Sequence, residues 1–239
     1  MINILVYPYE DIFEGRFAVL PGVQISEFLE SEKWSSIQSD DNFNVERKLH
    51  IACRKLCFMW KARCKAIEAE RDFYASTLKE SPALFGEDAI EVQYPLEACV
   101  LFARSAMDVA STIFGFSLPD PFNRKRYDSF NSLVKKCTKD TCELSISNNL
   151  RELRDNEKSW LSFIADTGKG RSIRDKIAHQ TEFPIGYEEL RESSEKEYAV
   201  VYVSNRSYMA LNEFLDELCI GVINGFLMFE RECISYLQD

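Results

Sequence analysis

Apolar residues recur every three or four positions along most of the chain, the spacing that gathers them on one face of an α-helix. Residues 45–79 contain no glycine or proline and are predicted to form one long helix. A second long helix is predicted from Asp88 to about Phe114, where Gly115 should end it, with Pro95 as a kink inside it. The first half of the chain is thus predicted to be mainly helical.

The second half continues this pattern with one interruption. Shorter helices are predicted at 124–137 and 148–166, and another carries Ile173 and Ile177 on one face. The segment 198–203 is rich in aromatic and β-branched residues, which predicts a strand that pairs with residues 182–190. Residues 206 to about 236 are predicted to form a closing apolar helix. Together these elements predict an all-α bundle with a small β-hairpin insertion near 182–204.

Composition and charge narrow the class of protein. Of the 239 residues, 46% are apolar and 13% aromatic, as in a globular protein. Every long apolar stretch is interrupted by charges, and the chain start lacks the basic region of a signal peptide. We therefore expect a cytoplasmic protein with no membrane contact. The net charge of −10 argues against binding nucleic acid through the overall field, but it leaves room for a local basic site.

Eight cysteines raise the question of disulfides or a metal site. Disulfides are disfavoured in a cytoplasmic protein, and the chain has no Cys-x-x-Cys pair of the kind that binds zinc. Cys53, Cys57 and Cys64 instead recur at the spacing of one helix face. Free buried thiols are the favoured interpretation, and no metal or cofactor is expected. The chain also lacks a phosphate-binding glycine loop and the H-E-x-x-H and G-x-S-x-G motifs.

The segment GRSIRDKIAHQ, residues 170–180, contains several residues that are candidates for a catalytic site. It holds His179, one of only two histidines in the chain, behind several charged residues. In a helix Arg171, Asp175 and His179 share a face, so Asp175 can support the imidazole or bond back to Arg171. Arg174 lies about 140° from His179 around an ideal helix, so the two do not meet directly. Histidine can exchange a proton near neutral pH, and arginine suits phosphate, which points to phosphodiester chemistry.

The run Arg174-Asp175-Lys176-Ile177-Ala178-His179 resembles the R-[N/D]-x-x-x-H signature of HEPN domains. Residues 97–111 resemble the helix that precedes the motif in that family, and the resemblance covers roughly residues 88–237. It implies a HEPN-like helical domain over residues 86–239. Residues 1–85 would then form an N-terminal extension whose long helix packs on the bundle.

The resemblance also implies a function. Many HEPN domains are metal-independent endoribonucleases of toxin–antitoxin and phage-defence systems, and the active ones are dimers whose two motifs face a shared groove. Carried over by position, Arg174 would bind the scissile phosphate, His179 would act as general acid and base, and Asp175 would orient the pair. The implied partners are RNA, a second copy of the chain, and an antitoxin or regulatory protein.

Other residues are candidates for supporting roles. Lys169, Arg171 and Lys176 give the motif a local positive field that could bind substrate or simply keep the segment solvated. Arg104 and Asp108 form an i, i+4 pair, expected to be a surface pair or to face the groove beside His179.

Two non-catalytic interpretations stay open. The motif can be a solvated helix face, with His179 capping a helix C-terminus. The whole domain can be a non-catalytic HEPN-like module that binds a nucleotide or protein partner or acts as a scaffold. The other histidine, His50, is expected to be a surface or satisfied interior residue.

Overall fold

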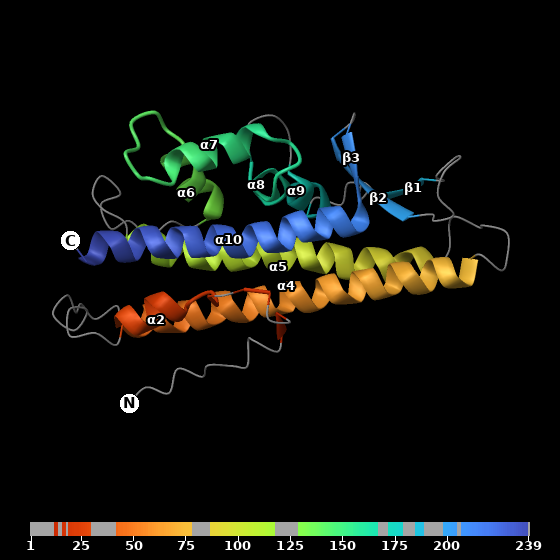
Figure 1. Ribbon diagram of the computed structural model, residues 1–239, viewed down its shortest axis with the longest axis horizontal. Coiled ribbons are helices and arrows are strands. Elements are labelled where there is room, and N and C mark those ends of the chain that lie inside the picture. The colour runs from red at the N-terminus through yellow and green to blue at the C-terminus, as the bar shows by residue number, and fades with distance from the viewer. Residues whose placement is uncertain are drawn as a thin grey trace. The chain divides into compact units, whose positions relative to one another are not determined.

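A computed structural model describes residues 12–13, 16–17, 19–29, 42–77, 87–117, 129–166, 172–178, 185–188, 198–204 and 207–238. Helices account for most of these residues, which confirms the predicted all-α class (Figure 1). The helices are α2 (Val23–Leu29), α4 (Asn42–Thr77), α5 (Glu87–Ser117), α6 (Phe130–Cys137), α7 (Ser147–Asp155), α8 (Trp160–Ile164), α9 (Ile173–Ala178) and α10 (Leu211–Gln238).

The chain forms two compact units, each assembled from distant stretches of sequence. Unit 1 comprises Met1–Cys57, Arg104–Glu152 and Val222–Asp239, and unit 2 comprises Phe58–Ala103 and Leu153–Gly221. The long helices α4, α5 and α10 each contribute one part to unit 1 and the other to unit 2. The division into residues 1–85 and 86–239 stays a prediction.

The predicted hairpin is present and has a third strand. Strands β1 (Ile185–Glu188) and β2 (Tyr198–Ser204) are antiparallel, and β3 (Ser207–Ala210) pairs with the other edge of β2. The closing helix was therefore predicted to start too early, since residues 207–210 extend the sheet and α10 begins at Leu211. The cross-strand pair of Tyr202 and Tyr208, with ring centroids 6.0 Å apart, favours this pairing over a further turn of helix.

Two other helix boundaries differ from the prediction. Residues 148–166 form two helices, α7 and α8, because the Ser159 side chain accepts a hydrogen bond from the Ser162 N–H and starts α8 anew. Helix α5 continues past Gly115 to Ser117, with Gly115 buried in it, so this glycine does not end the helix. Helix α6 begins at Phe130, and residues 124–128 of its predicted span lie outside the described part.

Unit 1 is built around phenylalanines from α5, α6 and α10. The ring of Phe114 stacks on Phe229 at 5.2 Å and meets Phe226 edge-on, while Phe130 packs edge-on against Phe229. All four side chains are fully buried. This cluster places the start of α6 against the two long helices.

Unit 2 brings α8 close to α10 through a glycine. A Cβ on Gly221 would lie 2.4 Å from Cδ1 of Trp160, so a larger residue would collide with the indole. The N–H of Trp160 donates to Glu217 of α10, and Phe163 packs on Phe214 at 4.6 Å. Because α8 contacts α9, this packing positions the helix that carries Arg174.

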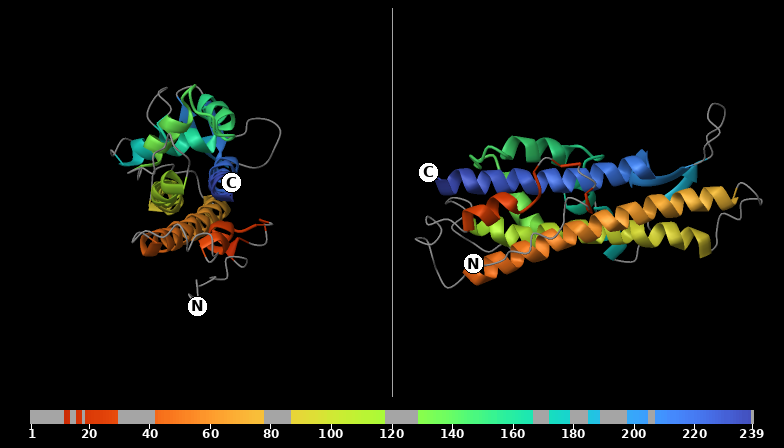
Figure 2. Two further views of the ribbon diagram at one scale, coloured as in Figure 1. Left: turned by 90° about the vertical axis from the view of Figure 1, so that its left-hand side faces the viewer. Right: turned by 60° about the horizontal axis from the view of Figure 1, so that its bottom comes forward.

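In unit 1, a buried carboxylate of α10 caps the N-terminus of α2. Glu230 is fully buried and accepts hydrogen bonds from the N–H groups of Gly22 (3.1 Å) and Ile25 (2.8 Å). The end view in Figure 2 shows α2 beside the start of α4, where the Cys53 thiol donates to the Pro21 carbonyl. Burial raises the pKa of Glu230, while the backbone donors oppose that shift.

We expect Glu230→Gln to change how stability depends on pH. A carboxyl whose pKa is raised on folding contributes most stability below its unfolded pKa of about 4.3, and that contribution falls as pH rises through the folded pKa. The glutamine variant cannot titrate and loses one acceptor oxygen, which costs about 1–3 kcal/mol. Its deficit in unfolding free energy should therefore be largest at low pH and shrink as the pH rises. Urea denaturation of the wild-type and variant proteins over a series of pH values tests this prediction. A deficit in unfolding free energy that does not change with pH would contradict a raised pKa for Glu230.

Candidate functional site

The described part of the motif, residues 174–178, lies on the short helix α9, whose start is well defined. The hydroxyl of Ser172 accepts a hydrogen bond from the Asp175 N–H at 3.2 Å, as an N-cap side chain does. The Ser172 carbonyl accepts from the Lys176 N–H at 3.1 Å, which closes the first turn. Ser172 and Ile173 are both buried and anchor the helix.

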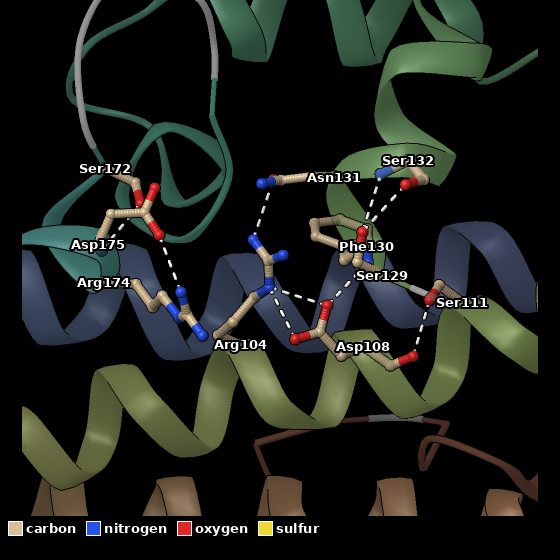
Figure 3. A network of polar contacts seen from close by, with 10 residues as sticks. All are labelled: Arg104, Asp108, Ser111, Ser129, Phe130, Asn131, Ser132, Ser172, Arg174 and Asp175. Atoms are coloured by element: carbon tan, nitrogen blue, oxygen red, sulfur yellow. Dashed lines mark hydrogen bonds and ion pairs between the residues drawn. The ribbon is translucent and has the colours of Figure 1, made fainter. Parts of the chain in front are cut away.

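Within this helix, Asp175 binds the neighbouring Arg174. The Arg174 guanidinium donates to Asp175 Oδ1 at 2.9 Å, and the side chains keep 33% and 21% of their surface exposed (Figure 3). The expected partners of Asp175, Arg171 and His179, lie outside the described residues. The structure thus supplies a partner for Asp175 that helical spacing alone did not suggest.

The other motif residues are only partly described. Lys176 is partly exposed on α9. His179 follows Ala178, the last residue of α9, in the chain. Like Lys169 and Arg171, it falls outside the described residues, so its role stays a prediction.

Arg104 and Asp108 form the predicted pair in unit 1, but the arginine is not on the surface. Arg104 is only 5% exposed, and its Nε donates to both carboxylate oxygens of Asp108 at 2.9 Å. A second nitrogen of Arg104 donates to Asn131 Oδ1 at 2.9 Å (Figure 3). The cost of burying the guanidinium is offset by these charge-assisted bonds. Of the two positions expected for this pair, the surface is therefore wrong for Arg104, and a position facing the groove stays a prediction.

This pair holds the start of α6 against α5. Asp108 Oδ1 also accepts from the N–H of Phe130, the first residue of α6, at 2.7 Å. One carboxylate thus satisfies a buried cation and a helix N-terminus together. Arg104 and Asp108 belong to unit 1 and the described motif residues to unit 2, and the expected supporting role beside His179 stays a prediction.

Sequence reasoning missed two partners at these sites. Ser172 carried a signal, since Ser-x-x-Asp over 172–175 is a capping pattern at the start of a helix. Asn131 carried none, because it meets Arg104 only through the packing of α6 on α5.

Two further features bear on the kind of protein this is. Across the part of the chain that the structure describes, no group of three or more His, Cys, Asp or Glu residues could hold a metal ion. Residues 90–115 of α5 form a helix long and apolar enough to cross a membrane, yet 61% of its most apolar window is buried within the protein. A core helix of a soluble protein has this character.

Comparison with known proteins adds no relative: no family model, no curated protein and no solved structure matches the chain.

We expect Asp108→Ala to destabilise the protein by about 3 kcal/mol, because it strips the carboxylate from a buried guanidinium and from the start of α6. The measurement is the free energy of unfolding in urea. Asp140→Ala, at an exposed position beyond α6, is the matched control and should change it by less than about 0.5 kcal/mol. Equal effects of the two substitutions would refute the conclusion that Asp108 holds the start of α6 against α5.

Proposed function

We propose that the protein is a metal-independent endoribonuclease of the toxin or defence type, acting as a homodimer with Arg174 and His179 as its catalytic pair. The observation that carries the proposal is the bond between Arg174 and Asp175. A guanidinium one-third exposed and held at 2.9 Å by a carboxylate is oriented without being withdrawn from solvent. Such an arginine is available to a phosphate and needs little reordering to bind it.

The chemistry requires only groups that RNA and this chain supply. A base removes the proton of the 2′-hydroxyl, whose oxygen attacks the adjacent phosphorus while an acid protonates the departing 5′-oxygen. His179 takes the acid and base roles, because an imidazole exchanges protons near neutral pH. Arg174 stabilises the charge that builds on the phosphate oxygens. The product ends are a 2′,3′-cyclic phosphate and a 5′-hydroxyl.

The proposed dimer answers a geometric problem within one copy. Five residues of helix turn through about 140°, so Arg174 and a helical residue at position 179 point in different directions. Two copies that bring their α9 helices to one groove can supply both groups to a single phosphate. Only the local field of the motif would attract RNA, because the whole chain carries a charge of −10.

We expect the wild-type protein to cleave labelled single-stranded RNA in EDTA, and His179→Ala to lose about 10²–10⁴-fold in rate. Arg174→Ala should lose a comparable factor, and Arg174→Lys should recover little, since lysine lacks the bidentate fork. His50→Ala replaces the other histidine, on α4, and is the matched control that should keep full activity.

The outcomes separate enzyme from binding module. Loss of cleavage in His179→Ala with the fold and dimer intact supports the nuclease. Equal cleavage by wild type and His179→Ala would refute the catalytic assignment. No cleavage by either, together with binding of nucleotide or a protein partner, would favour a non-catalytic domain.

A second expectation concerns how RNA reaches the site. Charge reversal at Lys169, Arg171 and Lys176 should reduce cleavage more than reversal at residues 124–126, a basic run that serves as the matched control. The reason is that phosphate contacts beside the motif place the scissile bond, whereas distant cations act only through a screened field. Rates for both triple variants on one substrate decide the matter, and equal losses would refute the localisation.

A further inference from the structure

Two cysteines from different helices meet inside unit 2. Cys99 of α5 and Cys219 of α10 share a thiol–thiol hydrogen bond, with their sulfurs 3.3 Å apart. The two positions are 120 residues apart in sequence, so only the folding of unit 2 brings them together. Both side chains are fully buried. The contact therefore holds two oxidisable groups next to each other in the core of the unit.

The part of α10 around Cys219 is anchored to two further helices. Asp216 accepts a hydrogen bond from Nε of Arg63 on α4 at 3.0 Å. One residue later, Glu217 accepts from the N–H of Trp160, the first residue of α8, at 3.0 Å. These bonds oppose sliding or rotation of α10, and so they keep the Cys219 thiol in its place beside α5.

A disulfide between the two cysteines requires only a small movement of the sulfurs. Bonded sulfurs lie about 2.05 Å apart, so the observed separation of 3.3 Å has to shorten by about 1.3 Å. Rotation about the two Cα–Cβ bonds moves both sulfurs without moving the helix backbones. The fold has also closed the long intervening loop already. The bond should therefore form more favourably in the folded chain than in the unfolded one.

Burial protects the reduced pair from reagents in solution. It is the main cause that raises the pKa of Cys219, and the hydrogen bond with Cys99 raises that pKa further. A protonated and enclosed thiol is a poor nucleophile. Reaction with a molecule from solution therefore requires a local opening between α5 and α10, and closure then brings the second thiol back to the first.

Two other cysteines provide a comparison for accessibility. Cys64 and Cys142 are partly exposed, contrary to the expectation that the cysteines are buried, whereas the other six are buried. Cys64 lies on α4 in unit 2, the unit that holds the buried pair. It can react without an opening of the core, so it separates the effect of exposure from that of a neighbouring thiol.

We propose that Cys99 and Cys219 are a modification site at which a low-molecular-weight disulfide such as oxidised glutathione closes an intramolecular disulfide between α5 and α10. During an opening, the thiolate of one cysteine attacks a sulfur of the small disulfide, whose S–S bond breaks, and one small thiol leaves with the proton that the cysteine lost. The second cysteine then attacks the protein sulfur of the mixed disulfide and releases the other small thiol in the same way. Two protein thiols and one small disulfide thus give one protein disulfide and two small thiols.

The product would link α5 to α10 covalently within unit 2. It would close a loop across 120 residues, which restricts the unfolded chain and raises the stability of the folded one. A reductant would reach the bond only through the opening that admitted the oxidant, so the oxidised state would persist after the oxidant is gone. The inference is independent of the proposed nuclease.

The first test identifies the product in the full chain. Reduced protein is incubated in a glutathione buffer rich in the oxidised form, quenched with acid, alkylated and digested with trypsin. Cleavage after residues 79, 104, 206 and 231 places each thiol in a fragment with no other cysteine, so the expected disulfide joins fragments 80–104 and 207–231. Free thiols or bound glutathione at both positions, or disulfides that join other cysteines in place of these, would overturn the proposal.

The second test asks whether the folded geometry suits the bond and encloses it. The oxidised protein should melt about 5–15 °C above the reduced protein. Dithiothreitol should reduce the disulfide at least about tenfold more slowly in native protein than in urea-unfolded protein, because the opening is rarely populated. An unchanged or lower melting temperature would show that the bond strains the fold, and equal reduction rates would show that it is not enclosed. Either result contradicts the proposed site.

Variants assign these effects to the pair. Cys99→Ala and Cys219→Ala should each abolish the disulfide and the rise in melting temperature on oxidation. Cys64→Ala replaces the partly exposed thiol of the same unit and is the matched control that should keep both. If an alanine variant does not fold, the fragment map of the wild type still decides the question. A rise in melting temperature that persists in Cys99→Ala and Cys219→Ala would refute the assignment.

Discussion

The carboxylates of α10 are the constraint on which the surrounding elements depend. In unit 2, Asp216 binds Arg63 of α4 and Glu217 accepts from the start of α8. In unit 1, Glu230 caps α2, and Glu232 accepts from the backbone N–H and hydroxyl of Ser145 before α7. Glu217 and Glu230 satisfy backbone donors that would be expensive to leave unpaired near a packed helix, and Asp216 pairs with the largely buried guanidinium of Arg63. The apolar face of α10 buries nonpolar surface, and its acidic residues determine which segments bind along the helix.

The candidate chemistry depends on short-range polar support of the same kind. Arg174 is held by the adjacent carboxylate, and the start of its helix by Ser172. The Arg174 guanidinium keeps some exposure while its carboxylate partner lies on the same helix. That arrangement orders a group for reaction without sealing it from substrate.

The predictions from sequence agree with the structure where the interactions are local and differ from it where the interactions join distant parts of the chain. Helices α4 and α5 were predicted to within a few residues, because their long runs of helical periodicity are local properties. The division of 148–166 and the strand at 207–210 were missed. The first depends on a capping serine inside an apolar run, and the second on pairing with β2. The surface, one of the two positions expected for Arg104, was wrong because its partner Asn131 comes from another helix.

By itself the sequence determined the all-α class, the hairpin, the long helices and the motif at 174–179, since periodicity, β-propensity and residue order are carried by neighbouring residues. Only the tertiary structure decided that Arg104 is buried, that Asp108 holds α6, and that Glu230 caps α2. Burial and pKa depend on groups brought together through space. The spacing of Arg104 and Asp108 predicted that these two residues pair, but it does not say that Asn131 and the start of α6 lie against them.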